Sequence, residues 1–157
     1  MLHWNKIINL TRIERLEEVV DRHYAESLFV GANLPPGSLT IADLGSGAGF
    51  PGLPIAILRP ECSVTLIESH QRKAVFLKEA SRGLPNLSVL SKRAEDVGGS
   101  FDWVVSRAVS PGAVLKIARR LAPDLALLCN STSLEADRVI PLPWAEPRNL
   151  LMFHVKQ

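Results

Sequence analysis

The stretch that decides the fold is Ile41-Ala42-Asp43-Leu44-Gly45-Ser46-Gly47-Ala48-Gly49-Phe50-Pro51-Gly52. An apolar segment ends in an acidic residue and then enters a loop with glycine at every second position. Glycine adopts positive φ readily and lets a ligand lie close to the main chain. The prolines that follow suit the first turn of a helix, where a missing N–H costs little. A strand, a glycine-rich turn and a helix in this order predict the first βα unit of a nucleotide-binding α/β sheet.

The spacing of the loop selects among nucleotide ligands. It reads D-x-G-x-G-x-G, whereas a dinucleotide fingerprint reads G-x-G-x-x-G and would require glycine in place of Phe50. Asp43 precedes the loop and favours a cationic or amine-bearing ligand over a pyrophosphate. Glu68 ends the next apolar segment, 19 residues after Gly49, near the usual place of a ribose-binding carboxylate. We therefore expect S-adenosylmethionine as cofactor; the alternative is an ordinary glycine-rich turn with Glu68 as a surface acid.

Length and composition indicate one globular domain. The chain has 157 residues, 46% of them hydrophobic, and a formal net charge of +2. Its two cysteines, Cys62 and Cys129, are too far apart in sequence for a metal or redox motif, and we expect no metal site. No signal peptide and no membrane-spanning apolar run is present, so we expect a cytoplasmic protein that does not enter a membrane.

Basic residues concentrate in the middle of the chain. Residues 59–93 carry seven Lys or Arg against three acids, and residues 107–120 carry four without an acid. Such a concentration is typical of a face that contacts nucleic-acid phosphates. The alternative interpretation is a set of solvated helix surfaces, which we favour for Lys116, Arg119 and Arg120.

The rest of the chain alternates between helical and strand patterns. Residues 1–34 form a small helical cap, in which Thr11-Arg12-Ile13-Glu14 is a capping box that opens the second helix. Pro35-Pro36-Gly37 separates this cap from a domain over 38–157. The expected helices cover 1–10, 11–22, 24–31, 52–59, 71–82, 112–121 and 134–139. After the strand that ends at Asp43, the expected strands cover 63–68, 87–90, 101–106, 125–129, 142–145 and 150–155.

Alternating βα units predict a mostly parallel, Rossmann-like sheet covered on both faces. Ligands of such sheets lie outside the carboxyl ends of the strands, where Asp43, Glu68 and Arg107 are expected. If the last strand runs antiparallel, its start returns to the same edge and brings Arg148 there. Two arginines beside a cationic cofactor need an anionic or hydrogen-bond-accepting partner, such as RNA phosphate or a guanine edge. For each arginine, the alternative is a surface salt bridge.

Several motifs together resemble the bacterial 16S ribosomal RNA guanine-N7 methyltransferases, the glucose-inhibited division protein B family. The resemblance covers essentially the whole chain. It rests on Trp4-Asn5-Lys6, Asn9-Leu10-Thr11, Arg22-His23-x-x-Glu26-Ser27-Leu28, the Asp43–Pro54 loop, Arg93-Ala94-Glu95, Phe101-Asp102-x-Val104-x-Ser106-Arg107-Ala108 and Arg148-Asn149-Leu150.

The resemblance implies a class I S-adenosylmethionine-dependent methyltransferase fold with an antiparallel last strand. It also implies methyl transfer to N7 of a guanosine in the decoding-region loop of 16S ribosomal RNA, with the small ribosomal subunit as partner and the protein a monomer. The residues it implies for the cofactor are Asp43, Gly45, Ser46, Gly47, Gly49, Phe50, Glu68, Arg93, Ala94, Glu95 and Arg107. For substrate positioning it adds Asn9 and His23 to Arg107 and Arg148, which the strand directions already place at this edge. The alternatives are that Asn9 simply ends the first helix and that His23 is a satisfied histidine at a helix end.

The chain departs from the family pattern at three places. The family has a helical segment before the Trp-Asn motif, whereas Met1 almost adjoins Trp4 here. Glu26 replaces an aspartate, and Cys129-Asn130 replaces a Lys-Gly pair. The last change removes a cation and a flexible glycine from the expected edge, and we expect weaker RNA binding or turnover from it.

The chemistry requires few catalytic groups. Guanine N7 has a free lone pair and loses no proton on methylation, so the enzyme needs positioning rather than a general base. Because N7 must stay free, we expect Arg107 to hold O6 or a phosphate, and Arg148 to position the RNA backbone. Two alternatives remain: a small-molecule methyltransferase, and an S-adenosylmethionine-binding protein that docks on the ribosome with weak or no catalysis. The N-terminal motifs and the basic residues argue against the first.

Overall fold

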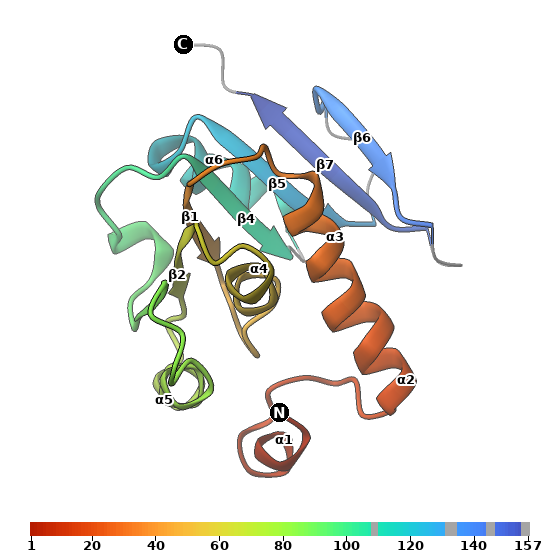
Figure 1. Ribbon diagram of the computed structural model, residues 1–157, viewed down its shortest axis with the longest axis vertical. Coiled ribbons are helices and arrows are strands. Elements are labelled where there is room, and N and C mark those ends of the chain that lie inside the picture. Colours follow the sequence, from red (N-terminus) through yellow and green to blue (C-terminus); the bar gives the residue numbers. More distant parts are fainter. Residues whose placement is uncertain (108–109, 131–134, 144–146, 155–157) are drawn as a thin grey trace.

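The computed structural model describes residues 1–107, 110–130, 135–143 and 147–154. Its centre is a seven-stranded sheet with the order β3-β2-β1-β4-β5-β7-β6 (Figure 1). Strands β1 to β5 are parallel, and β7 runs antiparallel to both of its neighbours, β5 and β6. The strands are β1 Thr40–Leu44, β2 Ser63–Ile67, β3 Leu87–Leu90, β4 Trp103–Arg107, β5 Asp124–Cys129, β6 Arg138–Pro141 and β7 Asn149–His154. The expected mixed sheet with an antiparallel last strand is confirmed.

Helices cover both faces of the sheet (Figure 1). They are α1 Leu2–Ile8, α2 Leu16–Val19, a π-helical turn Val20–Ala25, α3 Glu26–Asn33, α4 Gly52–Leu58, α5 Gln71–Ala80, a 3-10 turn Ala94–Asp96 and α6 Pro111–Leu121. Alternate strand residues feed two cores: Ile41 packs with Ile55 of α4 and Leu77 of α5, while Ala42 packs with Ala118 of α6. The strands are therefore buried on both faces, as their continuous apolar runs predict.

The N-terminal segment differs from the two helices expected over 11–22 and 24–31. The structure has one continuous helical run from Leu16 to Asn33, in which the π-helical turn Val20–Ala25 joins α2 to α3. The expected break near residue 23 is wrong, because the π-helical turn accommodates an extra residue and the helix continues through it.

The expected capping box is also wrong. The helix begins at Leu16 after Arg15, and no side chain caps its first turn. The Thr11 hydroxyl oxygen instead accepts from the Ile13 backbone N–H at 3.1 Å and lies 2.9 Å from Nε2 of His23. Since Thr11 has these partners, it cannot cap a helix that starts at residue 12.

The segment before the last strand differs from the expected helix and strand. The helix expected over 134–139 is contradicted where the structure describes it, because residues 138–141 form β6. Pairing with β7 decides this, since Arg138 lies opposite Met152 and Pro141 opposite Asn149. Proline is tolerated there because β6 is an edge strand. The strand expected over 142–145 is likewise displaced to 138–141, and residues 134, 144 and 145 lie outside the described residues.

Two further findings concern the described part of the chain. No helix in it is long and apolar enough to cross a membrane. No group of three or more His, Cys, Asp or Glu side chains in it is arranged to hold a metal ion.

Candidate functional site

The glycine-rich loop between β1 and α4 is fixed to the backbone of β1 and β2 by the side chain of its own Ser46. Ser46 Oγ donates to the Asp43 carbonyl at 3.0 Å and accepts from the Ile67 N–H at 3.1 Å. Gly45 and Gly47 have φ of 71° and 57°, which favour glycine. A Cβ added at Gly45 would meet no atom within 4 Å, so bare backbone faces open space there.

Asp43 holds this loop from inside the protein. Its side chain is fully buried, and Oδ2 accepts from the Gly52 N–H at 3.0 Å. Burial raises the pKa of Asp43 to about 7. Its Oδ1 has no hydrogen-bond partner in the described structure. Asp43 was expected to face a cationic ligand; the structure places it behind the loop, at the first turn of α4.

Glu68 follows β2 and supports the loop from the other side. Its Oε2 accepts from the Gly47 N–H at 2.9 Å, and its Oε1 accepts from the His70 N–H at 2.7 Å. The residue is 8% exposed. Each carboxylate oxygen keeps a further lone pair, so Glu68 can accept from a ligand while it orients the loop.

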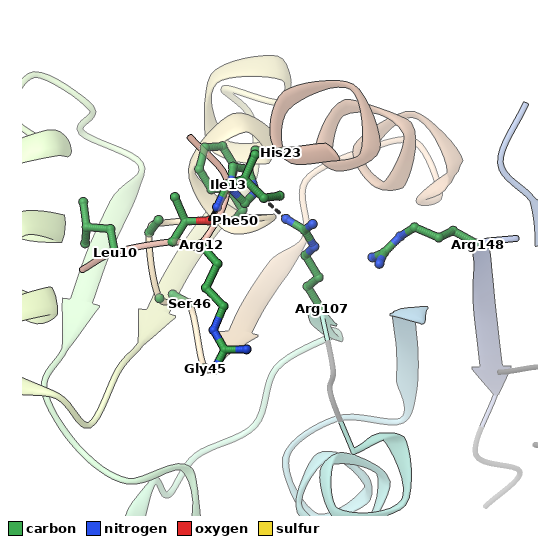
Figure 2. A pocket seen from close by; sticks show the side chains of 12 residues that line it. Leu10, Arg12, Ile13, His23, Gly45, Ser46, Phe50, Arg107 and Arg148 are labelled. Atoms are coloured by element: carbon green, nitrogen blue, oxygen red, sulfur yellow. Dashed lines mark hydrogen bonds between the residues drawn. The ribbon is translucent and has the colours of Figure 1, made fainter. Parts of the chain in front are cut away.

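A cavity of about 390 Å³ opens in front of the loop, within the size range of small-molecule sites (Figure 2). It joins the loop to the cap, to the carboxyl end of β4 at Arg107, and to Arg148, the residue before β7. Its lining residues are Leu10, Thr11, Arg12, Ile13, His23, Gly45, Ser46, Gly47, Ala48, Phe50, Arg107 and Arg148. The glycine-rich loop, His23 and the two arginines therefore line the same cavity, although they lie far apart in the sequence.

His23 is held in a neutral state on the cap side of this cavity. Its ring stacks on Phe50 with centroids 4.6 Å apart. Arg107 Nη1 contacts Nδ1, and because a guanidinium can only donate, Nδ1 accepts. Nε2 then carries the proton and donates to the Thr11 hydroxyl, 2.9 Å away. Burial, as the largest cause, and the positive charges of Arg107, Arg148 and Arg22 together lower the pKa of His23 to about 4.

The two expected arginines lie on the same side of the cavity. Figure 2 shows Arg107 projecting from the end of β4 between His23 and Arg148. Arg107 is the last residue of β4, and Arg148 directly precedes β7, whose antiparallel direction returns it to this edge. Each forms an ion pair with Glu26 of α3, with nitrogen–oxygen distances of 3.6 Å for Arg107 and 2.8 Å for Arg148. The salt bridges are therefore with a buried acid of the cap.

The remaining expected residues do not line this cavity. Asn9 ends α1 in a left-handed conformation and lines two neighbouring cavities, together with Lys6 and Glu14 in one and Lys73 in the other. Gly49 has φ of 93° and is packed against Leu53 and Leu77. Arg93, Ala94 and Glu95 lie at the 3-10 turn after β3, where Arg120 donates to the carbonyls of Ala94 and Glu95.

Sequence reasoning missed Thr11, Arg12 and Ile13, as well as Leu10 and Ala48 of the cavity lining and Glu26, which pairs with both arginines. The first three form the loop between α1 and α2, which was assigned to a helix. Glu26 was noted only as a replacement of aspartate. A signal existed for it: a carboxylate three residues after His23, on a helix with apolar neighbours, needs a cationic partner.

The sheet and the glycine-rich loop define a class I methyltransferase fold, and solved structures of this kind resemble it. A methyltransferase dependent on S-adenosylmethionine from Aquifex aeolicus gives a TM-score of 0.64 at 16% identity, over 87% of this chain and 93% of that one. An rRNA methylase from Streptococcus thermophilus gives 0.56 at 18% identity, over 85% of this chain and 95% of that one. At these identities the likeness shows the fold.

Sequence comparison identifies the family. A family model described as rRNA small subunit methyltransferase G matches residues 1–124. The ribosomal RNA small subunit methyltransferase G of Halorhodospira halophila is 42% identical over 150 residues, which are 92% of this chain and 71% of that protein. The Nitrosomonas europaea protein of that name is 47% identical over 112 residues, which are 68% of this chain and 51% of that protein. The chain belongs to the rRNA small subunit methyltransferase G family, and the methyltransferase class expected from the sequence is confirmed.

Proposed function

We propose that this protein transfers a methyl group from S-adenosylmethionine to N7 of a guanosine in the decoding-region loop of 16S rRNA, with the small ribosomal subunit as its partner. The observation that carries the proposal is that one cavity is lined both by the glycine-rich loop, where the main chain is open to a ligand, and by the two arginines. A glycine-rich loop lets a nucleoside approach the main chain closely, and two neighbouring guanidiniums can donate to the phosphates of RNA. Family membership supports both assignments.

The glycine-rich loop and Glu68 fit the cofactor. Gly45 and Gly47 line the cavity, and a Cβ added at either would meet no side chain within 4 Å. Glu68 accepts from the Gly47 N–H and offers lone pairs beside them. When bound, the cofactor supplies a methyl group already activated by its sulfonium. Neither arginine is required to hold a cationic molecule, so both remain available for RNA.

Positioning is the main task of the other side chains. Arg107 is assigned to O6 of the guanine or a phosphate, and Arg148 to the RNA backbone. Asn9 remains a candidate for an adjoining nucleotide, since one of the two cavities that it lines shares Leu10, Thr11 and Arg12 with the site. His23 has both ring nitrogens engaged and a lowered pKa, which suits a positioning role and not a general base.

The direct test maps the product. Small subunits from cells that lack the endogenous modification are incubated with the protein and labelled cofactor, and reductive aniline cleavage then cuts the RNA at N7-methylguanosine. A single cut in the decoding-region loop is expected, with loss of about 10²-fold in rate for Arg107→Ala or Arg148→Ala and little change in cofactor affinity. A wild-type protein that binds cofactor and subunits but produces no cut would contradict catalysis and support a docking protein.

A second measurement tests the cofactor pocket. Gly47→Val is expected to abolish S-adenosylmethionine binding in calorimetry, because a side chain there occupies the approach to the backbone. Glu68→Ala is expected to weaken binding by about 1–3 kcal/mol through lost hydrogen bonds. Gly99→Val is the control, since Gly99 also has a positive φ (108°), a Cβ there meets no atom within 4 Å, and the residue lies outside the cavity. Unchanged affinity in both test variants would exclude this pocket.

A further inference from the structure

Glu26 is a buried acid between the two arginines of the site. It is the first residue of α3, directly after the π-helical turn, and is 4% exposed. Its Oε1 lies 2.8 Å from Nε of Arg148, and its Oε2 lies 3.6 Å from Nε of Arg107. Among the residues that the structure describes, it is the only acid paired with either arginine.

The ionised form of Glu26 and the close approach of Arg107 and Arg148 depend on one another. Burial raises the pKa of Glu26, while Arg148, Arg107 and Arg22 each lower it. A buried carboxylate is costly without cationic partners, and two neighbouring guanidiniums repel one another without an anion. Glu26 therefore favours the arrangement in which both arginines lie together.

The arginines keep donors that these contacts do not use. Arg148 Nη1 donates to Asn130 Oδ1 at 3.3 Å, but its buried Nη2 has no hydrogen-bond partner in the described structure. Arg148 still lines the cavity. Arg148 therefore has hydrogen-bonding capacity beside the cavity that its protein contacts leave unsatisfied, and an anionic or oxygen-bearing ligand can satisfy it.

We propose that Glu26 is a positioning residue: its carboxylate holds Arg107 and Arg148 together so that both guanidiniums meet the RNA. This proposal rests on the proposed function, because it assigns the arginines to RNA. It predicts that the charge of Glu26 matters for RNA and not for the cofactor, which the proposed function assigns to the glycine-rich loop and Glu68.

The experiment compares Glu26→Gln, Glu26→Asp and, as control, Glu17→Gln, which removes an exposed charge from the same helical run. Glu26→Gln is expected to lower kcat/KM for small subunits at least about tenfold, since removal of one partner uncouples a buried charge cluster. Glu26→Asp, which keeps the charge, is expected to stay within about threefold of wild type. Cofactor affinity is expected to remain within about twofold in all three.

A double-mutant cycle separates positioning from a general loss of folding. In an Arg148→Ala background, Glu26→Gln is expected to cause much less than its tenfold loss, because one of its two targets is already absent. Independent, multiplicative losses would overturn the proposal. If the glutamine variant does not fold, the aspartate variant decides: activity as low as that of Arg148→Ala would exclude a role for the charge.

Subunit binding provides a readout that does not depend on methyl transfer. Sedimentation with small subunits is expected to show weaker binding for Glu26→Gln than for wild type and Glu17→Gln. Wild-type protein that binds but yields no aniline cut contradicts the proposed function alone. Equal binding and equal turnover of wild type and Glu26→Gln contradict the role of Glu26 and leave the proposed function intact.

Discussion

At the scale of single residues, His23 shows how a charge cluster fixes a protonation state. Its ring is stacked on Phe50 and lies beside Arg107, so the positive form of the ring would lose hydration and be repelled by the guanidinium. The folded-state pKa is lowered from 6.5 to about 4. The folded state therefore binds fewer protons than the unfolded state between these values, and this contribution to stability, present above pH 6.5, is lost as the pH falls through about 4.

We accordingly predict that His23 stays neutral throughout the working range of the enzyme. NMR of ring-labelled protein is expected to show the Nε2–H tautomer and no titration of His23 between about pH 5.5 and 8.5. Single-turnover methylation is expected to stay nearly flat from about pH 6.5 to 8.5, because no proton is removed from N7. A His23 midpoint near its ordinary value would mean that the Arg107 contact is not formed in solution.

Asp43 gives the opposite pH dependence. Its pKa is raised by burial from 3.8 to about 7, so its contribution to stability is complete below about pH 4 and is lost as the pH rises through about 7. Asp43→Asn keeps an oxygen for the Gly52 N–H but cannot ionise. We predict that urea unfolding of the variant, relative to wild type, gains stability with pH by up to about 1.4 kcal/mol per unit within that window. Parallel curves for the two proteins would contradict the raised pKa.

At the scale of elements, α4 lies unusually close to the sheet at its first residue. A Cβ added at Gly52 would lie 2.7 Å from Asp43 Oδ2 and would also contact Leu66 of β2. Gly52→Ala is therefore expected to lower the free energy of unfolding by about 1–3 kcal/mol, because neither the buried carboxylate nor the core leucine can move freely.

Gly98→Ala is the matched control for this substitution, since its added Cβ meets nothing within 4 Å. It is expected to change stability by less than about 0.5 kcal/mol. Urea unfolding of both variants measures the difference. An equal effect of the two substitutions would mean that α4 can shift away from β1 and β2 without cost.

The elements also show which sequence patterns are sufficient to predict secondary structure. The apolar runs of β1, β2, β4 and β5 predicted buried parallel strands, and the glycine-rich loop predicted the turn that precedes α4. Residues 138–141 gave no such pattern, because β6 is an exposed edge strand that pairing with β7 creates. The run from Leu16 to Asn33 was divided wrongly, since nothing in a local pattern signals a π-helical turn.

At the scale of the whole molecule, the site could be predicted only in part. Arg107 and Arg148 were expected at one edge from strand directions, and they line one cavity. Thr11 and Glu26 could not be placed, because their contacts with His23 and the arginines join segments up to 122 residues apart. Such contacts depend on how the cap packs on the sheet, which periodicity does not encode.

That packing predicts that the cap and the sheet unfold together. Leu10, Val30 and Leu34 of the cap belong to the same buried cluster as Ile41 of β1 and Ile55 of α4. Each part also reports through its own tryptophan. Trp4 of α1 packs edge-on against Phe76 of α5 with ring centroids 5.7 Å apart, and Trp103 of β4 is 2% exposed.

The experiment uses a Trp144→Phe background, in which Trp103→Phe leaves only Trp4 and Trp4→Phe leaves only Trp103. Because one continuous core should unfold as a unit, urea transitions followed by either tryptophan and by far-UV circular dichroism are expected to coincide within each variant. A Trp4 transition at lower urea than the circular dichroism transition would show that α1 detaches first. The cap would then be a separate unit resting on the methyltransferase domain, and the cavity wall that it supplies would be lost before the sheet unfolds.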